Sequence, residues 1–192
     1  LFSSQYVHQH SAWTNRSTLP AGTATFPRLL RQAGWHTAAV GKMHFTPTYL
    51  DVGFERMVLA EQNGDGRFED DYHTWLMGQG YVDSVDLVDQ VDAFRCRAGR
   101  TYYENFGAFE SNLPKELHST AWITRQALKE IGNWDVQGGN LLMVGYIKPH
   151  HPFDPPAPYS TMYDPQTIQI PSGYIPEVLP GDFANHPGFF DH

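Results

Sequence analysis

The sequence predicts an α/β fold in which a mixed sheet is flanked by helices, and two helix–strand pairs carry this prediction. Residues 23–33 have the apolar spacing of an amphipathic helix, and the short apolar run 37–40 follows directly after Gly34. Residues 117–131 form a second helical pattern, which precedes the apolar run 141–147. A helix followed by a buried strand is the repeating unit of α/β proteins.

The two helices have recognisable ends. Thr23 or Thr25 is available to cap the first helix, and Gly34 ends it. Gly132 ends the second helix. Its apolar face is expected to consist of Ala121, Trp122, Leu128 and Ile131.

The remaining segments show weaker patterns. Residues 51–114 are acidic and aromatic without a sustained period, and we expect an irregular peripheral excursion with a helical turn or two. Aspartates recur there at every third position from 83 to 92, alternating with valines. Residues 155–187 contain eight prolines, which predicts mostly extended loop. The apolar run 141–147 is expected to be a central strand of the sheet.

Composition limits the possible partners. The chain has 192 residues, 41% of them hydrophobic, which is enough to bury a core. Its formal net charge of −8 and the lack of basic runs argue against binding to nucleic acid or to an anionic membrane surface. The one cysteine, Cys96, excludes an intrachain disulfide but does not indicate the compartment. We find no signal-peptide pattern, and both ends suggest a chain truncated at either side.

Cationic and ionisable side chains follow both apolar runs. Lys42 and His44 come after the first, and Lys148, His150 and His151 come after the second. Ligands bind at the carboxyl ends of strands in α/β folds, so these side chains would make a pocket for an anion. Exposed loop residues are the alternative interpretation. Lys148 and His151 would either line the substrate side of this pocket or face solvent.

Metal binding is a competing interpretation of the histidines. His150 and His151 are adjacent, and His8 and His10 are two residues apart, but neither pair has the spacing or the carboxylates of a zinc site. An EF-hand loop that begins at Glu61 would have a tyrosine where a bidentate glutamate is needed. We therefore predict no metal ligand in this chain.

Two motifs resemble the sulfatase family of the formylglycine type. Residues 34–44 match its second signature, which runs Gly-Tyr-x-Thr, a short apolar strand and Gly-Lys-x-His, with Trp35 in place of the usual tyrosine. The segment Pro-His-x-Pro-Phe at 149–153 resembles the later Pro-His-x-Pro segment of the family. The longer stretch 144–150 resembles iduronate-sulfatase-like members.

The resemblance implies a fold and separate roles for three residues. The fold would be alkaline-phosphatase-like, with residues 1–192 forming part of the N-terminal catalytic domain. Lys42 would bridge the nucleophile and a sulfate oxygen, and His44 would act on the geminal hydroxyl so that sulfate is eliminated. His150 would contact the sulfate and protonate the leaving alcohol, while His151 is a candidate for substrate binding. His118 would either start a helix or contact substrate.

The resemblance also implies groups that this chain does not supply. Leu1 and Phe2 resemble the tail of the Cys-x-Pro-x-Arg signature, although Ser3 and Ser4 depart from it, so the cysteine that becomes formylglycine would lie just before residue 1. Calcium is expected in the full-length protein, with ligands outside this chain. The chain alone would then be inactive. The implied substrate is a small-molecule or saccharide sulfate ester, and the oligomeric state is not indicated.

Two alternatives have different functional consequences. A phosphonate or phosphodiester hydrolase of the same superfamily is one, although phosphonate monoester hydrolases typically have Tyr and Thr at the positions of Lys42 and His44. The other is a non-catalytic, sulfatase-like anion-binding protein.

Overall fold

The structure, a computed structural model, describes residues 1–62, 66–105 and 107–172. The chain divides into two compact units, residues 1–160 and residues 161–192. Within the described part of the second unit, Asp164 accepts a hydrogen bond from the backbone N–H of Gln166 (2.9 Å) and caps a short 3₁₀ turn. The expected loop over residues 173–192 and residues 63–65 of the EF-hand candidate lie outside the described residues.

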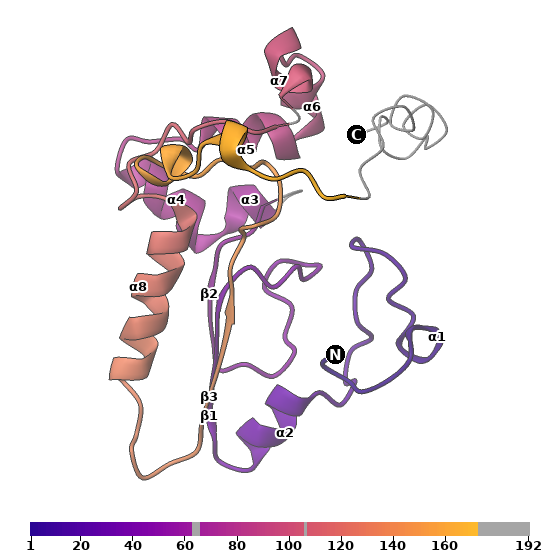
Figure 1. Cartoon of the computed structure of the whole chain (residues 1–192). Coiled ribbons are helices and arrows are strands. Elements are labelled where there is room, and N and C mark those ends of the chain that lie inside the picture. The colour runs from indigo at the N-terminus through magenta and orange to yellow at the C-terminus, as the bar shows by residue number, and fades with distance from the viewer. Residues whose placement is uncertain (63–65, 106, 173–192) are drawn as a thin grey trace. The chain divides into compact units, whose positions relative to one another are not determined.

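The first unit contains a three-stranded parallel sheet with helices around it (Figure 1). The strands are β1 (His36–Gly41), β2 (Arg56–Leu59) and β3 (Asn140–Gly145). The helices are α1 (Val7–His10), α2 (Phe26–Gln32), α3 (Gly66–Glu69), α4 (Asp71–Gly78), α5 (Ser84–Gln90), α6 (Asp92–Arg95), α7 (Arg100–Glu104) and α8 (Ser119–Gly132). Short 3₁₀ turns span Tyr159–Thr161 and Pro165–Thr167. The predicted α/β class is confirmed, although a mixed sheet was expected and both pairings between the described strands are parallel.

The order of the described strands is β2–β1–β3, so β1 is the central strand of this sheet. Both pairings are parallel, and Gly41 lies beside Leu59 on one side and Gly145 on the other. The sequence predicted the β3 strand correctly but placed it at the centre. Its residues are mostly half-buried, whereas β1 is buried from Thr37 to Gly41.

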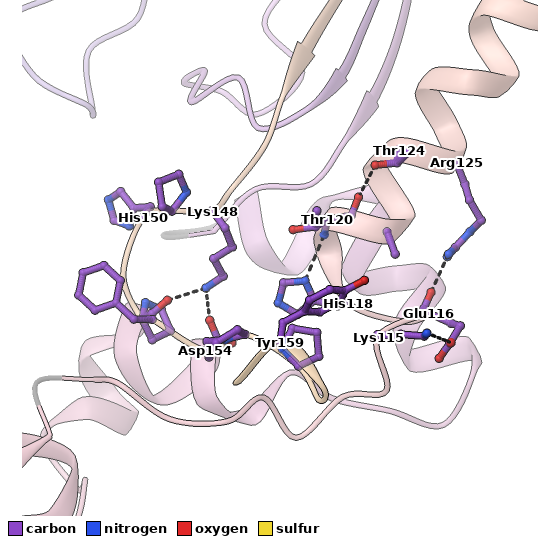
Figure 2. A pocket seen from close by; sticks show the side chains of 16 residues that line it. Lys115, Glu116, His118, Thr120, Thr124, Arg125, Lys148, His150, Asp154 and Tyr159 are labelled. Atoms are coloured by element: carbon purple, nitrogen blue, oxygen red, sulfur yellow. Dashed lines mark hydrogen bonds and ion pairs between the residues drawn. The ribbon is translucent and has the colours of Figure 1, made fainter. Parts of the chain in front are cut away.

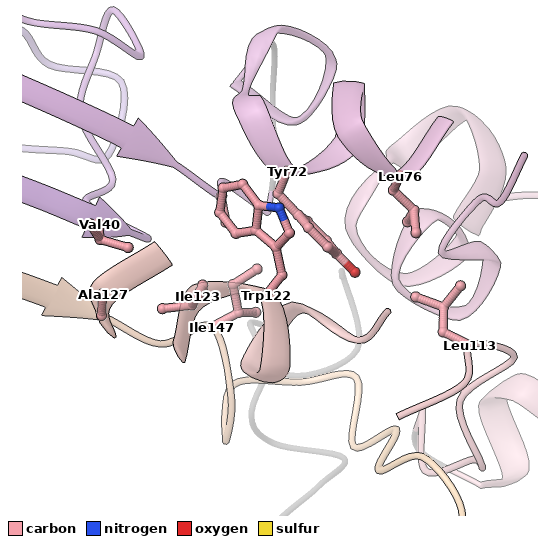
Figure 3. Packing of buried hydrophobic residues seen from close by; sticks show 9 residues of the cluster. Val40, Tyr72, Leu76, Leu113, Trp122, Ile123, Ala127 and Ile147 are labelled. Carbon is pink, nitrogen blue, oxygen red and sulfur yellow. The ribbon is translucent and has the colours of Figure 1, made fainter. Parts of the chain in front are cut away.

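Side chains of β1 enter two separate hydrophobic clusters, one on each face of the sheet. Val40 packs with Tyr72, Trp122 and Ile123 on the α8 side (Figure 3). Ala39 belongs to the other cluster, which contains Met43, Val52, Phe54 and Leu59. A strand that is covered on both faces needs a continuous apolar run, which explains why residues 37–40 lack polar alternation.

Helix α8 confirms the second predicted helix, and Trp122 is buried as predicted, but the rest of its inward face differs from the prediction. Ile123 and Ala127 are buried, whereas Leu128 is 62% exposed. Glu130 is buried and forms an ion pair with Arg56 (Oε1–Nε 2.5 Å). The buried face of α8 therefore combines the apolar residues Ile123 and Ala127 with a charge that is paired to β2, and apolar periodicity alone does not indicate such a face.

Helix α2 confirms the first predicted helix, although Thr25 does not cap it through its side chain. The hydroxyl of Thr25 donates instead to the carbonyl of Val52 (2.5 Å). Gly34 adopts a positive φ of 85° after the helix and turns the chain into β1. The first twenty residues contain only the one-turn helix α1 between loops.

Residues 51–114 differ from the irregular peripheral excursion that we expected. The segment contributes strand β2 and helices α3 to α7, and Tyr72 and Leu76 from α4 belong to the α8-side core. Asp83, Asp86 and Asp89 are buried, whereas Asp92 and Val82 are exposed, so the first three acidic positions of the repeat face inward. The carboxylate of Asp86 is paired with Arg67, a cation distant in sequence, which the local pattern does not show.

None of the helices in the described residues is long and apolar enough to cross a lipid bilayer.

Candidate functional site

The two loops with cationic side chains leave the sheet at the same edge. Strands β1 and β3 are parallel neighbours in register up to Gly41 and Gly145, and the backbone N–H of Lys42 donates to the carbonyl of Gly145 (2.8 Å). A Cβ atom on Gly41 would lie 2.0 Å from that same carbonyl oxygen. Only glycine allows the two strand ends to approach this closely, which brings both loops together.

Lys42 is half-buried at the start of the first loop. Its Nζ donates to Oε1 of Gln62 (2.8 Å). Burial lowers the pKa of Lys42, while the carboxylates of Glu61 and Asp86 raise it and the charge of Lys148 lowers it further. The side chain is therefore held in place by an uncharged partner and remains available to an added anion.

The backbone at His44 is fixed by hydrogen bonds to Glu61. It has a left-handed φ of 59°, and the N–H groups of Met43 and His44 both donate to Oε1 of Glu61 (2.9 Å each). Burial lowers the pKa of the His44 ring, and the charges of Lys42 and His150 lower it further. The charges of Lys42 in the first loop and of His150 in the second therefore both act on the His44 ring.

His150 lies in the second loop with an exposed ring. Its Nδ1 hydrogen-bonds the carbonyl oxygen of His151 (2.8 Å), and because a carbonyl only accepts, Nδ1 must carry the proton. Burial of part of the ring lowers the pKa of His150, the His151 carbonyl raises it, and the charge of Lys42 lowers it. The other ring nitrogen, Nε2, is thereby left as the reactive atom.

His151 and Lys148 have carboxylate partners. The Nδ1 atom of His151 lies 2.5 Å from Oδ2 of Asp89, and about half of the His151 side chain is exposed. Lys148 forms an ion pair with Asp154, and its Nζ lies 3.7 Å from Oδ1 of Asp86. Lys148 is thus mostly buried in the protein, and its contacts are structural.

The residues that connect the loops carried no recognisable motif. Gln62 and Asp86 are fully buried, and Nε2 of Gln62 donates to Oδ1 of Asp86 (2.8 Å). Asp86 also forms an ion pair with buried Arg67. The acidic repeat was the only signal for Asp86, and nothing in the sequence singled out Gln62.

A cavity of about 670 Å³ adjoins His150 (Figure 2). Carbon atoms dominate its wall, with four prolines and Phe153 among the lining side chains. His118 also lines it and caps α8, its Nδ1 accepting from the N–H of Thr120 (3.3 Å). Burial, with a smaller effect of Lys148, lowers the pKa of His118 to about 4, so this ring is neutral at pH 7. The lining residues are Lys115, Glu116, His118, Thr120, Ala121, Thr124, Arg125, Lys148, Pro149, His150, Pro152, Phe153, Asp154, Pro155, Pro156 and Tyr159.

No three carboxylate, imidazole or thiolate side chains lie close enough to hold a metal ion in the part of the chain that the structure describes.

Comparison with known proteins identifies the family. The family model described as Sulfatase matches residues 1–177. An arylsulfatase of Clostridium perfringens (strain 13 / Type A) is 29% identical over 167 residues, covering 80% of this chain and 31% of that protein. The N-acetylglucosamine-6-O-sulfatase of Bacteroides thetaiotaomicron is 31% identical over 91 residues, covering 46% of this chain and 16% of that protein.

A solved structure shares the fold. The phosphonate monoester hydrolase SpPMH from Silicibacter pomeroyi superimposes with a TM-score of 0.59 at 22% identity, covering 91% of this chain and 35% of that one. This chain thus spans 31% of the length of the arylsulfatase and 35% of that of the hydrolase. The fold is of the alkaline-phosphatase-like kind, and the match over residues 1–177 shows that the chain belongs to the sulfatase family.

Proposed function

We propose that the complete protein hydrolyses an organic sulfate monoester to an alcohol and sulfate, and that Lys42, His44 and His150 of this chain bind and process the sulfate group. The observation that carries the proposal is geometric: Lys42 and His44 follow β1, His150 follows the parallel neighbour β3, and the two strand ends meet where the N–H of Lys42 donates to the carbonyl of Gly145. A cluster of like-charged groups with depressed pKa values is stabilised when an anion enters it. Residues 1–192 would form part of the N-terminal catalytic domain.

Lys42 is assigned to the sulfate oxygens. Its ammonium group would neutralise charge that builds up on the oxygens as the S–O bond breaks. Gln62 accepts only one of the three hydrogens of Nζ, so donors remain for the ester. Bound sulfate would also raise the pKa of Lys42 and keep it charged.

His150 is assigned to the leaving group. With Nδ1–H donating to the His151 carbonyl, a neutral ring presents a lone pair on Nε2. Binding of the anionic ester favours the doubly protonated ring, whose Nε2–H then faces the ester oxygen and protonates the departing alcohol. The proton on Nδ1 stays in its hydrogen bond throughout.

His44 is assigned to the nucleophile side. Burial and the neighbouring cations keep its ring neutral near pH 7, so it can take a proton from a hydroxyl group. Formylglycine, which the family resemblance implies outside this chain, would supply that hydroxyl. Calcium likewise belongs to the proposal for the complete protein, and no step is assigned to it.

The cavity beside His150 is assigned to the organic group of the ester. Its wall suits a ring-bearing small molecule or a saccharide unit, because proline and aromatic faces pack against rings. His151, at the rim beside Asp89, is the further candidate for contact with the substrate. The similarity of the 144–150 segment to iduronate-sulfatase-like members supports a sulfate ester without naming it.

The test compares two classes of ester on the complete protein. We expect a higher kcat/KM for 4-nitrophenyl sulfate than for 4-nitrophenyl phenylphosphonate, and loss of the sulfatase reaction in Lys42→Met. A strong preference for the phosphonate would favour the phosphonate hydrolase alternative. That alternative is tested because the chain shares its fold with the hydrolase SpPMH. Sulfate binding without turnover of either ester would favour a non-catalytic anion-binding protein.

A further inference from the structure

Gln62 lies between the two loops of the candidate site and is fully buried. Its Oε1 accepts from Nζ of Lys42 (2.8 Å) in the first loop. Its Nε2 donates to the backbone carbonyl of His151 (2.8 Å) in the second loop and to Oδ1 of Asp86 (2.8 Å). One amide group therefore contacts both loops at once.

Only one orientation of this amide satisfies its neighbours. Lys42 can only donate, so it must face the amide oxygen. The carboxylate of Asp86 and the carbonyl of His151 can only accept, so they must face the amide nitrogen. A side chain without both a donor and an acceptor cannot make this set of contacts.

The carbonyl of His151 links Gln62 to the ring of His150 through hydrogen bonds. It accepts from Nε2 of Gln62 and also hydrogen-bonds Nδ1 of His150 (2.8 Å). Gln90 donates to the same oxygen (3.1 Å), but among the described residues the hydrogen bonds of its side chain reach only Asp89 and His151. Gln62 alone among these amides also holds Lys42.

We propose that Gln62 is a positioning residue that holds Lys42 and His150 at the spacing required to contact one sulfate group. The proposal rests on the proposed sulfatase function and adds a residue for which neither motif accounts. Gln62 need not touch the ester. It acts by fixing Nζ of Lys42 and the carbonyl that orients the His150 ring.

Gln62 also affects the charge of Lys42. A hydrogen bond to an oxygen acceptor favours the ammonium form, so removing the amide would lower the pKa of Lys42. The other groups that act on Lys42 would remain in place. They are Glu61 and Asp86, which raise its pKa, and Lys148, with His44 and His150 as neighbouring ionisable rings.

The experiment uses Gln62→Met in the complete protein, because methionine preserves volume and removes both hydrogen-bonding functions. We expect kcat/KM for 4-nitrophenyl sulfate to fall about 100-fold, mainly through kcat, since small misplacements of reacting groups have effects of this size. The alkaline limb of the pH–rate profile should move to lower pH. The matched control, Gln90→Met, removes an amide from the same carbonyl but none from Lys42, so its alkaline limb should stay at the wild-type pH.

A second readout does not depend on activity. The rate of Lys42 acetylation by acetic anhydride, followed by mass spectrometry across pH, reports the pKa of Lys42 directly. We expect a lower pKa in Gln62→Met, whereas Gln62→Glu retains an acceptor for Nζ and should not lower it. Gln62→Glu also keeps the test decisive if the methionine variant does not fold.

The outcomes separate the two proposals. If the folded Gln62→Met protein keeps the wild-type pKa of Lys42 and the wild-type pH–rate profile, Gln62 is not a positioning residue. An equal loss in Gln90→Met, or a lowered pKa of Lys42 in Gln62→Glu, would also overturn this role. If wild-type protein hydrolyses no sulfate ester, the proposed function fails, and the labelling result still decides whether Gln62 holds Lys42.

Discussion

The backbone N–H of Lys42 donates to the carbonyl oxygen of Gly145 over 2.8 Å, which joins the ends of β1 and β3 at the point where both site loops begin. The contact continues the parallel register of the two strands by one residue. A shift of either strand would separate Lys42 from His150. The geometry of the candidate site therefore depends on the close approach of two glycines.

Replacing Gly41 with alanine should destabilise the protein. The new Cβ would lie 2.0 Å from the Gly145 oxygen, and φ at this position is 92°. Strain and overpacking together should cost on the order of 3 kcal/mol of unfolding free energy, measured by urea denaturation. Gly22→Ala is the control, since φ is 79° there but nothing lies within 4 Å, so only the backbone strain remains. Equal losses in the two variants would show that the close approach does not matter.

Removing the buried cation at position 67 should have a larger effect than removing an exposed one. Arg67 pairs with Asp86, and its Nη2 donates to the carbonyl of Asp83 (2.8 Å). Arg67→Met leaves the buried carboxylate of Asp86 without its closest cation and should lower the free energy of unfolding by about 3–5 kcal/mol. Arg100→Met breaks the exposed Arg100–Glu104 pair and should cost no more than about 0.5 kcal/mol. Similar urea midpoints for both variants would contradict the importance of the buried network.

Asp83 should make the protein less stable as pH rises. Burial, and then the charges of Asp86 and Asp154, raise the pKa of Asp83 to about 6 from an ordinary value of 3.8. The folded state thus favours the protonated acid, a contribution fully present below pH 3.8 and lost as pH rises through 6. Asp83→Asn keeps an acceptor for the N–H of Asp86, which Asp83 caps. The difference in unfolding free energy between Asp83→Asn and wild type should shift in favour of the variant by on the order of 2–3 kcal/mol from pH 4 to pH 7.5. A pH-independent difference would contradict the raised pKa.

His118 should act as a helix cap that tolerates asparagine. Its Nδ1 accepts from the N–H of Thr120 at the start of α8. His118→Ala should lower the melting temperature by an amount that corresponds to about 1 kcal/mol of unfolding free energy. His118→Asn retains an acceptor for the Thr120 N–H, so its melting temperature should fall less. If both variants melt together well below wild type, packing of the ring rather than capping explains its position.

The sequence predicted those parts of the fold that are encoded locally. Helix α2, strand β1 and its loop lie within one continuous motif, and the apolar run of β3 leads directly into His150. Periodicity and glycine positions are properties of neighbouring residues, so they predict such units well. The expected site loops were therefore placed correctly on the strand ends.

The remainder depends on contacts between distant segments. Gln62 meets Lys42 and the His151 carbonyl only through the tertiary fold, and buried Asp86 is paired with Arg67. Aspartates are usually solvent-exposed, and the paired cation makes the burial of ionised Asp86 possible. Strand β2 was missed because it has only four residues, which are too few to carry a periodic signal.

The most direct test of the convergence of Lys42, His44 and His150 is a sulfate titration followed through the imidazole NMR resonances of the complete protein. Burial and the mutual effects of these cations lower the pKa of both rings, so bound sulfate should raise the pKa of His44 and of His150 together. Lys42→Met should weaken the sulfate dependence of both rings in parallel. If sulfate leaves the titration of His44 and His150 unchanged, or if the response persists in full without Lys42, the three residues do not form one sulfate site.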